Sequence, residues 1–119
     1  MRSNERRPLH RRAADSLRGL GEGFRRERAL RTHLLLSALA IAGLAWAQPG
    51  LAWALVVALL LVLGLAAELL NGALEASLDR LHPGHDPEIG AAKDMASAAL
   101  LVINGAAAVA FVGAMLSSC

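Results

Sequence analysis

The chain has 119 residues, enough for one small domain, and 55% of them are hydrophobic whereas only 3% are aromatic. Twelve basic and ten acidic residues give a formal net charge of +2. Long uncharged apolar runs are typical of membrane-spanning segments, so this composition argues against a soluble globular domain. The single cysteine, Cys119, is the last residue and cannot form a disulfide within the chain, so we expect no role for it.

The chain begins with a basic segment, since residues 1–31 contain ten arginines and four acidic residues. It is too long and too charged for a cleaved signal peptide, and we expect residues 1–28 to stay attached at the cytoplasmic membrane surface. Within residues 9–26 the apolar side chains recur at steps of three or four: Leu9, Ala13, Leu17, Leu20 and Phe24. This spacing predicts an amphipathic helix on an anionic leaflet. Three glycines disfavour a helix there, which leaves a solvated basic tail as the alternative.

Three apolar stretches follow, and each can cross a bilayer, whose core takes about 20 helical residues. They predict membrane helices at residues 29–47, 51–81 and 89–116. The intervening segments Gln48-Pro49-Gly50 and 82–88 contain the helix breakers proline and glycine. We therefore expect one all-α membrane domain that includes the whole chain, residues 1–119.

The distribution of basic residues predicts the orientation of these helices. Ten arginines lie before the first helix or in its first turn, Arg80 and Lys93 flank the second loop, and the turn at 48–50 has none. Positively charged loops stay on the cytoplasmic side of the membrane. The N-terminus and the 82–88 loop are therefore expected inside, and Cys119 outside.

A row of polar residues interrupts the second apolar helix near its cytoplasmic end. At about 100° per residue, four of them fall within roughly an 80° sector: Glu68, Asn71, Glu75 and Asp79. Because the bilayer core should end near residue 70, Glu68 lies within it and Glu75, about 10 Å further along, lies outside. A charge inside a span costs about 2.5–3.5 kcal/mol at the centre and is kept mainly for function. Asp79 taken alone could equally be a carboxylate that reaches solvent.

The other two membrane helices are expected to bring polar groups to the same level. Lys93 and Asp94 lie at the cytoplasmic end of the third helix, with Ser97 one turn deeper. Glu27 lies at the start of the first. Taken alone, Lys93 could simply extend its ammonium group to the membrane–water interface. Glu27 could form an ion pair with Arg31, four residues further along the helix.

Acids, an amide and a lysine at a membrane surface suit phosphoryl transfer. Mg²⁺ is held by one or two carboxylates and phosphate oxygens, the acceptor hydroxyl needs a base, and a cation must offset the charge on the phosphates. A lipid acceptor and a water-soluble nucleotide could meet only at such an interface. The glycine-rich and catalytic-loop motifs of soluble nucleotide-binding proteins are absent from the sequence.

Two motifs extend this interpretation. The pattern Glu68-Leu-Leu-Asn71-x-x-x-Glu75-x-x-x-Asp79-Arg80, followed by Ala92-Lys93-Asp94-Met95-x-Ser97-Ala98-Ala99, resembles the prokaryotic diacylglycerol kinase family over about residues 13–116. The resemblance implies a surface helix, three membrane helices and a homotrimer whose active sites are shared between neighbouring subunits. It implies transfer of the γ-phosphate of ATP to a lipid hydroxyl with Mg²⁺, in the bacterial cytoplasmic (inner) membrane. No nucleic-acid partner is expected.

The resemblance also implies roles for individual residues. Glu68 would be the general base on the lipid hydroxyl, and Glu27 and Glu75 would hold the metal–ATP complex. Lys93 would contact the phosphates, with Asp94 orienting it. The remaining matches would surround the nucleotide and the catalytic centre (Asn71, Asp79, Gly84, His85 and Asp86) or the lipid head group (Ser97).

The sequence departs from the diacylglycerol-specific pattern in its N-terminal part. The position of the substrate-contacting arginine of that type falls near Pro8, so this role is assigned to none of the surrounding arginines (Arg6, Arg7, Arg11 and Arg12). The aromatic residue that this type has on the nucleotide side aligns with Asp15. Residues 27–33 are more similar to the related undecaprenol kinases, which favour a Glu-Arg…His pattern. The AKDM-x-SAA stretch is more similar to the diacylglycerol kinases. We expect diacylglycerol as acceptor and keep undecaprenol as the alternative.

Two other classes of function compete with a kinase. A small proton-coupled transporter would favour an acid nearer the membrane midplane than Glu68. A purely structural or regulatory membrane peptide would leave the polar row and the Lys93-Asp94 pair unexplained. Consumption of ATP distinguishes the kinase from both.

Overall fold

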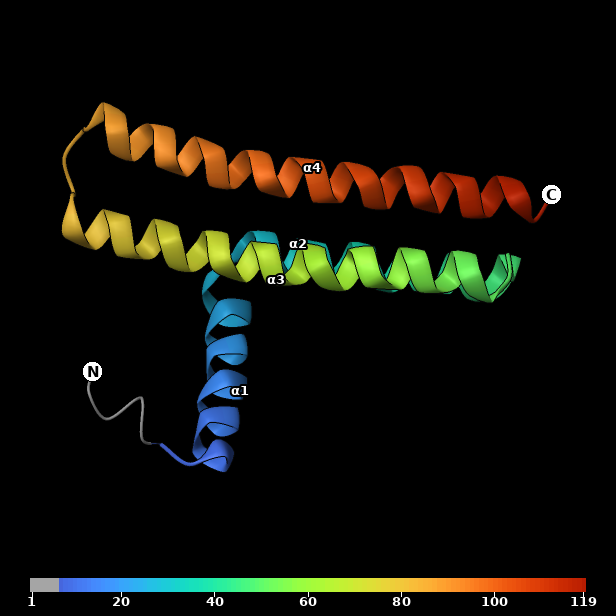
Figure 1. Cartoon of the computed structure of the whole chain (residues 1–119), viewed down its shortest axis with the longest axis horizontal. Coiled ribbons are helices and arrows are strands. Elements are labelled where there is room, and N and C mark those ends of the chain that lie inside the picture. The colour runs from blue at the N-terminus through green and yellow to red at the C-terminus, as the bar shows by residue number, and fades with distance from the viewer. Residues whose placement is uncertain (1–6) are drawn as a thin grey trace.

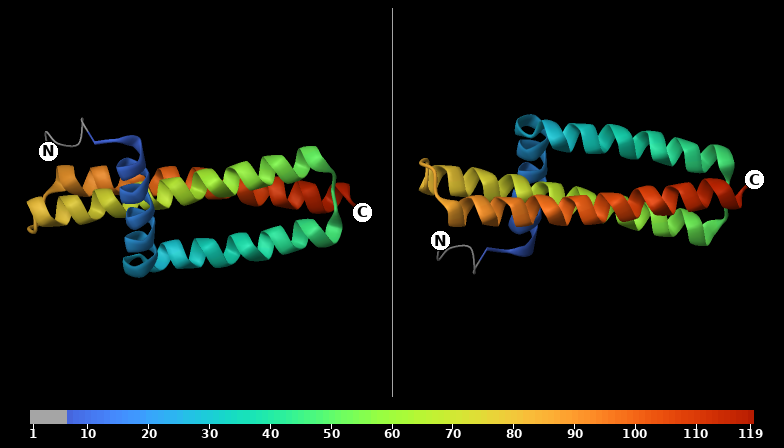
Figure 2. Two further views of the ribbon diagram at one scale, coloured as in Figure 1. Left: turned by 90° about the horizontal axis from the view of Figure 1, so that it is seen from below. Right: turned by 90° about the horizontal axis from the view of Figure 1, so that it is seen from above.

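The structure, a computed structural model, describes residues 7–119. Arg6 and the other residues before it, which the sequence assigns to the cytoplasmic segment, lie outside this range. The described part is all helical, with four helices in chain order: α1 (Leu9–Arg26), α2 (Arg28–Ala47), α3 (Leu51–Leu81) and α4 (Pro87–Ser117). α2, α3 and α4 lie alongside one another as a bundle, and α1 runs across its direction (Figures 1 and 2).

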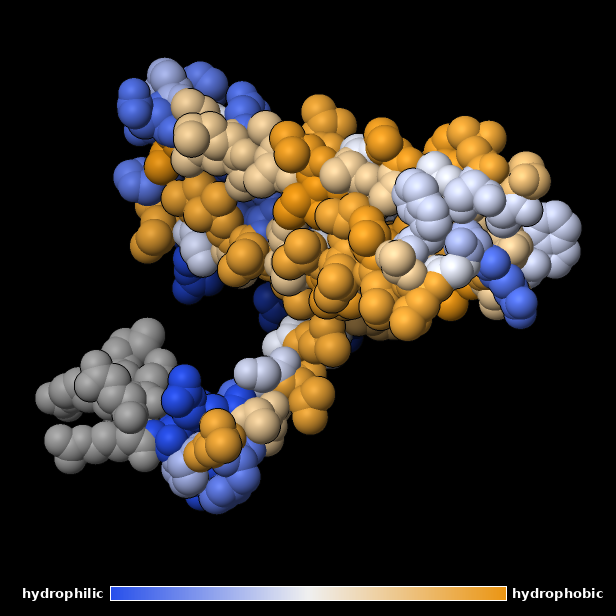
Figure 3. Space-filling view, turned by 45° about the vertical axis from the view of Figure 1, so that its right-hand side comes forward, coloured by the Kyte–Doolittle hydropathy of each residue, from blue (hydrophilic) through white to orange (hydrophobic). Residues whose placement is uncertain are grey.

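The bundle helices confirm the prediction of three membrane spans. α2 has 20 residues, and α3 and α4 have 31 each; all three are long and apolar enough to cross a membrane. A 31-residue helix is about 46 Å long, well beyond a hydrocarbon core of about 30 Å. α3 and α4 therefore extend past the core at the end where their connecting loop lies. In Figure 3 apolar side chains cover the bundle, and hydrophilic ones gather at that end and on α1.

The helix ends have local causes. Gln48 takes a left-handed conformation (φ 47°) as its N–H bonds the carbonyl of Leu44, and Gly50 has φ 111°, which favours glycine. α4 starts at Pro87, two residues before the predicted position 89. Asp86 caps it by accepting hydrogen bonds from the backbone N–H groups of Glu88 (2.8 Å) and Ile89 (3.3 Å), and proline suits the first helical position.

α1 is helical through all three of its glycines, so residues 9–26 are not an extended tail. Ion pairs within the helix offset part of the glycine cost: Asp15 pairs with Arg18, and Glu22 with Arg25 and Arg26. Asp15 also pairs with Arg7. None of the α1 side chains is buried. The apolar side chains of α1 are therefore available to a membrane or to another chain.

Small residues let the helices approach closely at the end of the bundle opposite the α3–α4 loop. The core there consists of Leu44, Val57 and Ala114, one from each bundle helix. The ring of Trp53 occupies the space beside Gly113: a Cβ on residue 113 would lie 2.6 Å from the ring atom Cη2. Close approach through small residues is the usual way in which membrane helices associate.

This contact predicts a stability effect. Gly113→Leu should destabilise the protein by about 1–3 kcal/mol, because the added side chain must displace the Trp53 ring from a packed site. Thermal unfolding in detergent would measure the change. Val112→Leu, on the neighbouring residue whose side chain is 54% exposed, is the control and should leave the melting temperature nearly unchanged. An equal melting temperature for Gly113→Leu and the control would contradict the close packing.

Candidate active site

The polar row predicted on the second membrane helix lies on α3 near its junction with the α3–α4 loop. Glu68, Asn71 and Glu75 are half-buried, and Asp79 is exposed. The Asn71 amide lies 3.5 Å from Glu75 Oε1, a long hydrogen bond between adjacent members of the row. Asn71 Oδ1 is buried and has no hydrogen-bond partner within residues 7–119. That oxygen is free to accept a bond from a ligand.

α4 adds a cation to this row. The ammonium group of Lys93 pairs with the carboxylate of Asp79, which joins the two helices near their loop. The sequence placed both residues around the nucleotide but did not predict that they pair. Asp94, expected to orient Lys93, is exposed, and no hydrogen bond joins their side chains in the described part of the chain. Lys93 is therefore held toward the α3 row by Asp79.

The break between α1 and α2 adds a carboxylate. Glu27 has extended backbone angles (φ −102°, ψ 110°) and separates the two helices. Its side chain packs against Gly72: a Cβ on residue 72 would lie 2.8 Å from Glu27 Oε1 and 3.0 Å from Glu27 Cδ. Gly72 follows Asn71 and precedes Glu75 by three residues, so Glu27 reaches the same part of α3 as the row. The glycine leaves the space that the carboxylate occupies.

A small cavity of about 180 Å³ adjoins Glu27 where α1 passes α3, and it is lined in part by Glu22, Gly23 and Gly72. A hydrogen bond from Arg25, with the charges of Arg25 and Arg26, holds the pKa of Glu22 below its usual value. Glu22 is therefore an anion at neutral pH. Sequence reasoning did not single it out, because its pairing with nearby arginines looks like that of any surface helix.

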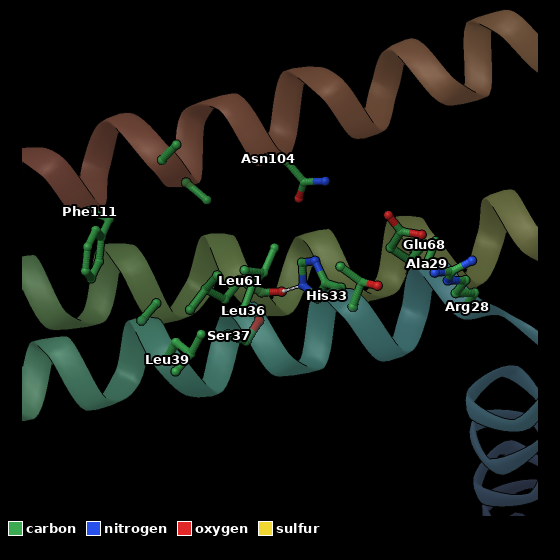
Figure 4. A pocket seen from close by; sticks show the side chains of 14 residues that line it. Arg28, Ala29, His33, Leu36, Ser37, Leu39, Leu61, Glu68, Asn104 and Phe111 are labelled. Carbon is green, nitrogen blue, oxygen red and sulfur yellow. Dashed lines mark hydrogen bonds between the residues drawn. The ribbon is translucent and has the colours of Figure 1, made fainter.

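A larger pocket of about 770 Å³ opens between α2 and α4, with α3 behind it (Figure 4). Arg28, Ala29 and Glu68 lie toward one end, and Leu39 and Phe111 toward the other.

Two polar side chains, His33 from α2 and Asn104 from α4, lie between these ends of the pocket (Figure 4). His33 is only 8% exposed, and its Nε2 lies 2.9 Å from the carbonyl oxygen of Leu61. A carbonyl can only accept, so Nε2 donates this bond.

Besides Glu22, sequence reasoning missed the packing of Glu27 against Gly72, the place of His33 in a pocket, and Asn104. A signal for Asn104 was present, because it is a lone amide in the otherwise uncharged stretch 95–119, and polar groups within membrane spans are usually functional. His33 entered only as part of a family pattern. Gly72 could not be recognised, because its importance depends on what packs against it.

The other predicted residues are not brought together within one chain. Gly84 and His85 are exposed in the α3–α4 loop, and Asp86 caps α4. Ser97 is exposed on α4, and its side chain makes no hydrogen bond to residues 7–119. These side chains are open to a nucleotide, a lipid or a second chain.

The carboxylates around Gly72 are compatible with the Mg²⁺ that the sequence resemblance implies. No group of three His, Cys, Asp or Glu side chains is placed to hold a metal ion among residues 7–119. Mg²⁺ does not need such a cage, because it usually takes one or two carboxylates and fills its other positions with phosphate oxygens and water. Glu27 packs against Gly72, which precedes Glu75 on α3 by three residues, so two carboxylates belong to this part of the fold.

Comparison with known proteins identifies the family of the chain. The sequence profile of the family described as prokaryotic diacylglycerol kinase matches residues 14–116, which include α2, α3, residues 14–26 of α1 and all but the last residue of α4. No curated protein matches the chain. The matched region contains the whole polar row on α3, Glu27 and Lys93. The chain therefore belongs to the prokaryotic diacylglycerol kinase family, a family of membrane-bound bacterial lipid kinases.

Proposed function

We propose that the protein transfers the γ-phosphate of ATP to diacylglycerol at the cytoplasmic membrane interface and so produces phosphatidic acid. The observation that carries this proposal is the meeting of Glu27, the α3 row and Lys93 near one end of an apolar bundle. At that level of the membrane, a lipid hydroxyl from the bilayer and a nucleotide from the aqueous phase can both reach the site. The membership of the chain in a lipid kinase family supports the same reaction class.

Glu68 is the group best placed to act as general base. It belongs to the α3 row and also lines the 770 Å³ pocket, so one carboxylate faces both the polar end and the apolar groove. In the proposed step it takes the proton of the lipid hydroxyl as that oxygen bonds to the γ-phosphorus. The bond from the γ-phosphorus to the β–γ bridging oxygen breaks, and ADP leaves.

Lys93 and the carboxylates bind the nucleotide in this proposal. Lys93 offsets the negative charge that accumulates on the phosphate oxygens, and Asp79 keeps it directed at the site. Glu27 and Glu75 would hold Mg²⁺, which would supply positive charge to offset the charge of the phosphates. Asn71, beside Glu75, and Asp94, Gly84, His85 and Asp86 around the loop are proposed to complete the nucleotide site, and Ser97 the head-group site.

α1 is proposed to lie on the cytoplasmic surface of the membrane. It crosses the direction of the bundle (Figures 1 and 2), so a bundle along the membrane normal leaves α1 in the plane of the interface. Its apolar side chains are exposed, with Leu9 at 79% and Leu17 at 69%. Its arginines would attract anionic lipid. This placement requires the N-terminus inside and Cys119 outside.

A homotrimer is proposed as the active assembly. One chain leaves Asp94 and Ser97 exposed although both belong to the family motif, and it leaves much of the apolar surface of α4 uncovered, including Val102 and Val109. A neighbouring chain could cover that surface and complete the site. The mass of the protein in mild detergent should correspond to three chains, and a fully active monomer would contradict the assembly.

Undecaprenol is the second candidate acceptor. The observation that favours it is the Glu27-Arg28…His33 pattern, in which His33 lies buried in the wall of the large pocket. Both candidates share the hydroxyl that Glu68 would activate. They differ in the atoms next to it, and the pocket would have to distinguish them there.

Phosphate transfer from labelled ATP by purified protein in mixed micelles tests the proposal. Diacylglycerol and undecaprenol are offered separately, each with Mg²⁺ and with EDTA. Mg²⁺-dependent labelling of diacylglycerol is the expected result. Labelling of undecaprenol alone would replace the acceptor while keeping the enzyme class. Labelling of neither lipid by folded protein would refute the kinase and favour a transport assay.

A further inference from the structure

We propose that Asn104, packed beside His33, donates a hydrogen bond to an ester carbonyl of the lipid acceptor, and that this contact makes the enzyme selective for a glycerol ester over a long-chain alcohol. The inference rests on the lipid kinase activity proposed above and concerns the part of the acceptor just beyond the reacting hydroxyl. It is carried by two polar side chains that the catalytic step does not use.

Asn104 and His33 approach each other across a glycine. A Cβ on Gly64 would lie 2.6 Å from His33 Cε1 and 2.9 Å from Asn104 Oδ1, so both side chains occupy the space that a larger residue 64 would fill. Figure 4 shows Asn104 reaching from α4 toward His33 on α2. Gly64 is buried and lies one helical turn before Glu68 on α3, about 6 Å deeper in the membrane.

Of these two side chains, Asn104 is the one that can bond an ester. The His33 Nε2–H is already donated to the carbonyl of Leu61, and an ester has no donor for the other ring nitrogen. The Asn104 side chain, which is half-buried, makes no hydrogen bond to any side chain or backbone group of residues 7–119. A polar amide in hydrocarbon without a partner is costly, so its presence calls for one. If Asn104 served only to hold the helices together, its amide would be hydrogen-bonded to His33, and no such bond is present.

The order of groups along the pocket matches a diacylglycerol. Glu68 lies toward one end, the Asn104 amide and His33 lie next, and Leu39 and Phe111 follow. In a diacylglycerol the free hydroxyl is followed on the adjoining glycerol carbon by an ester, and then by acyl chains. The amide N–H of Asn104 can donate to an ester carbonyl. A polyprenol has only hydrocarbon at that depth, and it would leave the amide unpaired.

The depth of Glu68 is consistent with this arrangement. Side chains on a helix lean toward its N-terminus, and the N-terminus of α3 lies at the outer side of the membrane in the proposed orientation. The carboxylate of Glu68 therefore leans toward the level of Gly64. A hydroxyl at Glu68 and an ester at Asn104 can then belong to one glycerol unit.

The test compares two lipids that differ only at the ester. Purified full-length protein in mixed micelles is assayed with dioleoylglycerol and with its ether analogue, dioleylglycerol, and kcat/KM is measured for each. The wild type should prefer the ester by about three- to tenfold, the factor that one neutral hydrogen bond contributes. In Asn104→Leu this ratio should fall toward one through loss on the ester alone, while the rate with the ether lipid stays unchanged.

Controls separate recognition from folding. Asn104→Ala, which only removes atoms, should give the same collapse of the ester-to-ether ratio, and the melting temperature of both variants is recorded. Val62→Ala, on an exposed face of α3 outside the pocket lining, should keep the wild-type ratio. An equal loss with both lipids, or no ester preference in the wild type, would overturn the ester site while leaving the kinase intact. Failure of the wild type to label any lipid would refute the kinase itself, and the ester site with it.

Discussion

Glu68→Gln is expected to lower the rate of lipid phosphorylation by about 10²–10⁴-fold, the range over which a general base contributes. The amide has nearly the same shape as the carboxylate and cannot take the hydroxyl proton. Because Glu68 lies toward one end of the lipid pocket and one helical turn away from the Asn71–Glu75 pair, its loss should leave nucleotide binding almost unchanged. Steady-state assays with varied ATP should therefore show a reduced kcat and a similar KM for ATP.

A measurement of nucleotide affinity shows whether the lower rate of Glu68→Gln comes from loss of the base or from weaker ATP binding. Binding of a fluorescent ATP analogue to Glu68→Gln should match the wild type within about twofold, and the melting temperature should be unchanged or higher, since a costly charge leaves the membrane. Retention of more than a tenth of the wild-type rate would exclude Glu68 as the base. A parallel loss of rate and nucleotide affinity would assign it to the nucleotide site instead.

Glu75→Gln is expected to act through the metal. The proposed Mg²⁺ site has only two carboxylates, Glu27 and Glu75, so neutralising one removes half of its protein charge. Substitutions of residues that merely support metal ligands cost about 10–100-fold in metal affinity or activity, and a direct ligand should cost at least as much. The Mg²⁺ concentration for half-maximal rate should rise by at least tenfold, with partial recovery of rate at high Mg²⁺.

The control for this experiment is Glu88→Gln, the same chemical change in the first turn of α4 and away from the α3 row. It should keep the wild-type Mg²⁺ dependence. An unchanged Mg²⁺ curve for Glu75→Gln, with only a lower maximal rate, would remove Glu75 from the metal site. In that case its contact with Asn71 would be its main role.

Periodicity and composition determined the helices of this protein. The second span was predicted at 51–81 and is α3, Leu51–Leu81, and the first begins one residue earlier than expected. These elements follow from local rules: apolar length determines a span, and proline and glycine end it. The start of α4 was misplaced by two residues, because the capping bonds of Asp86 make the loop sequence His-Asp-Pro a helix start. The row on α3 was equally local, since it depends only on helical spacing.

The tertiary structure decided which residues from different helices meet. Glu27 reaches α3 because Gly72 leaves room for its carboxylate, and Lys93 points to Asp79 because α4 packs beside α3. Likewise, Gly64 brings His33 and Asn104 together although they are 71 positions apart in sequence. Helical spacing determines the face on which a side chain lies, but not the residue opposite it. That depends on the crossing of the helices and on where a missing Cβ allows them to approach.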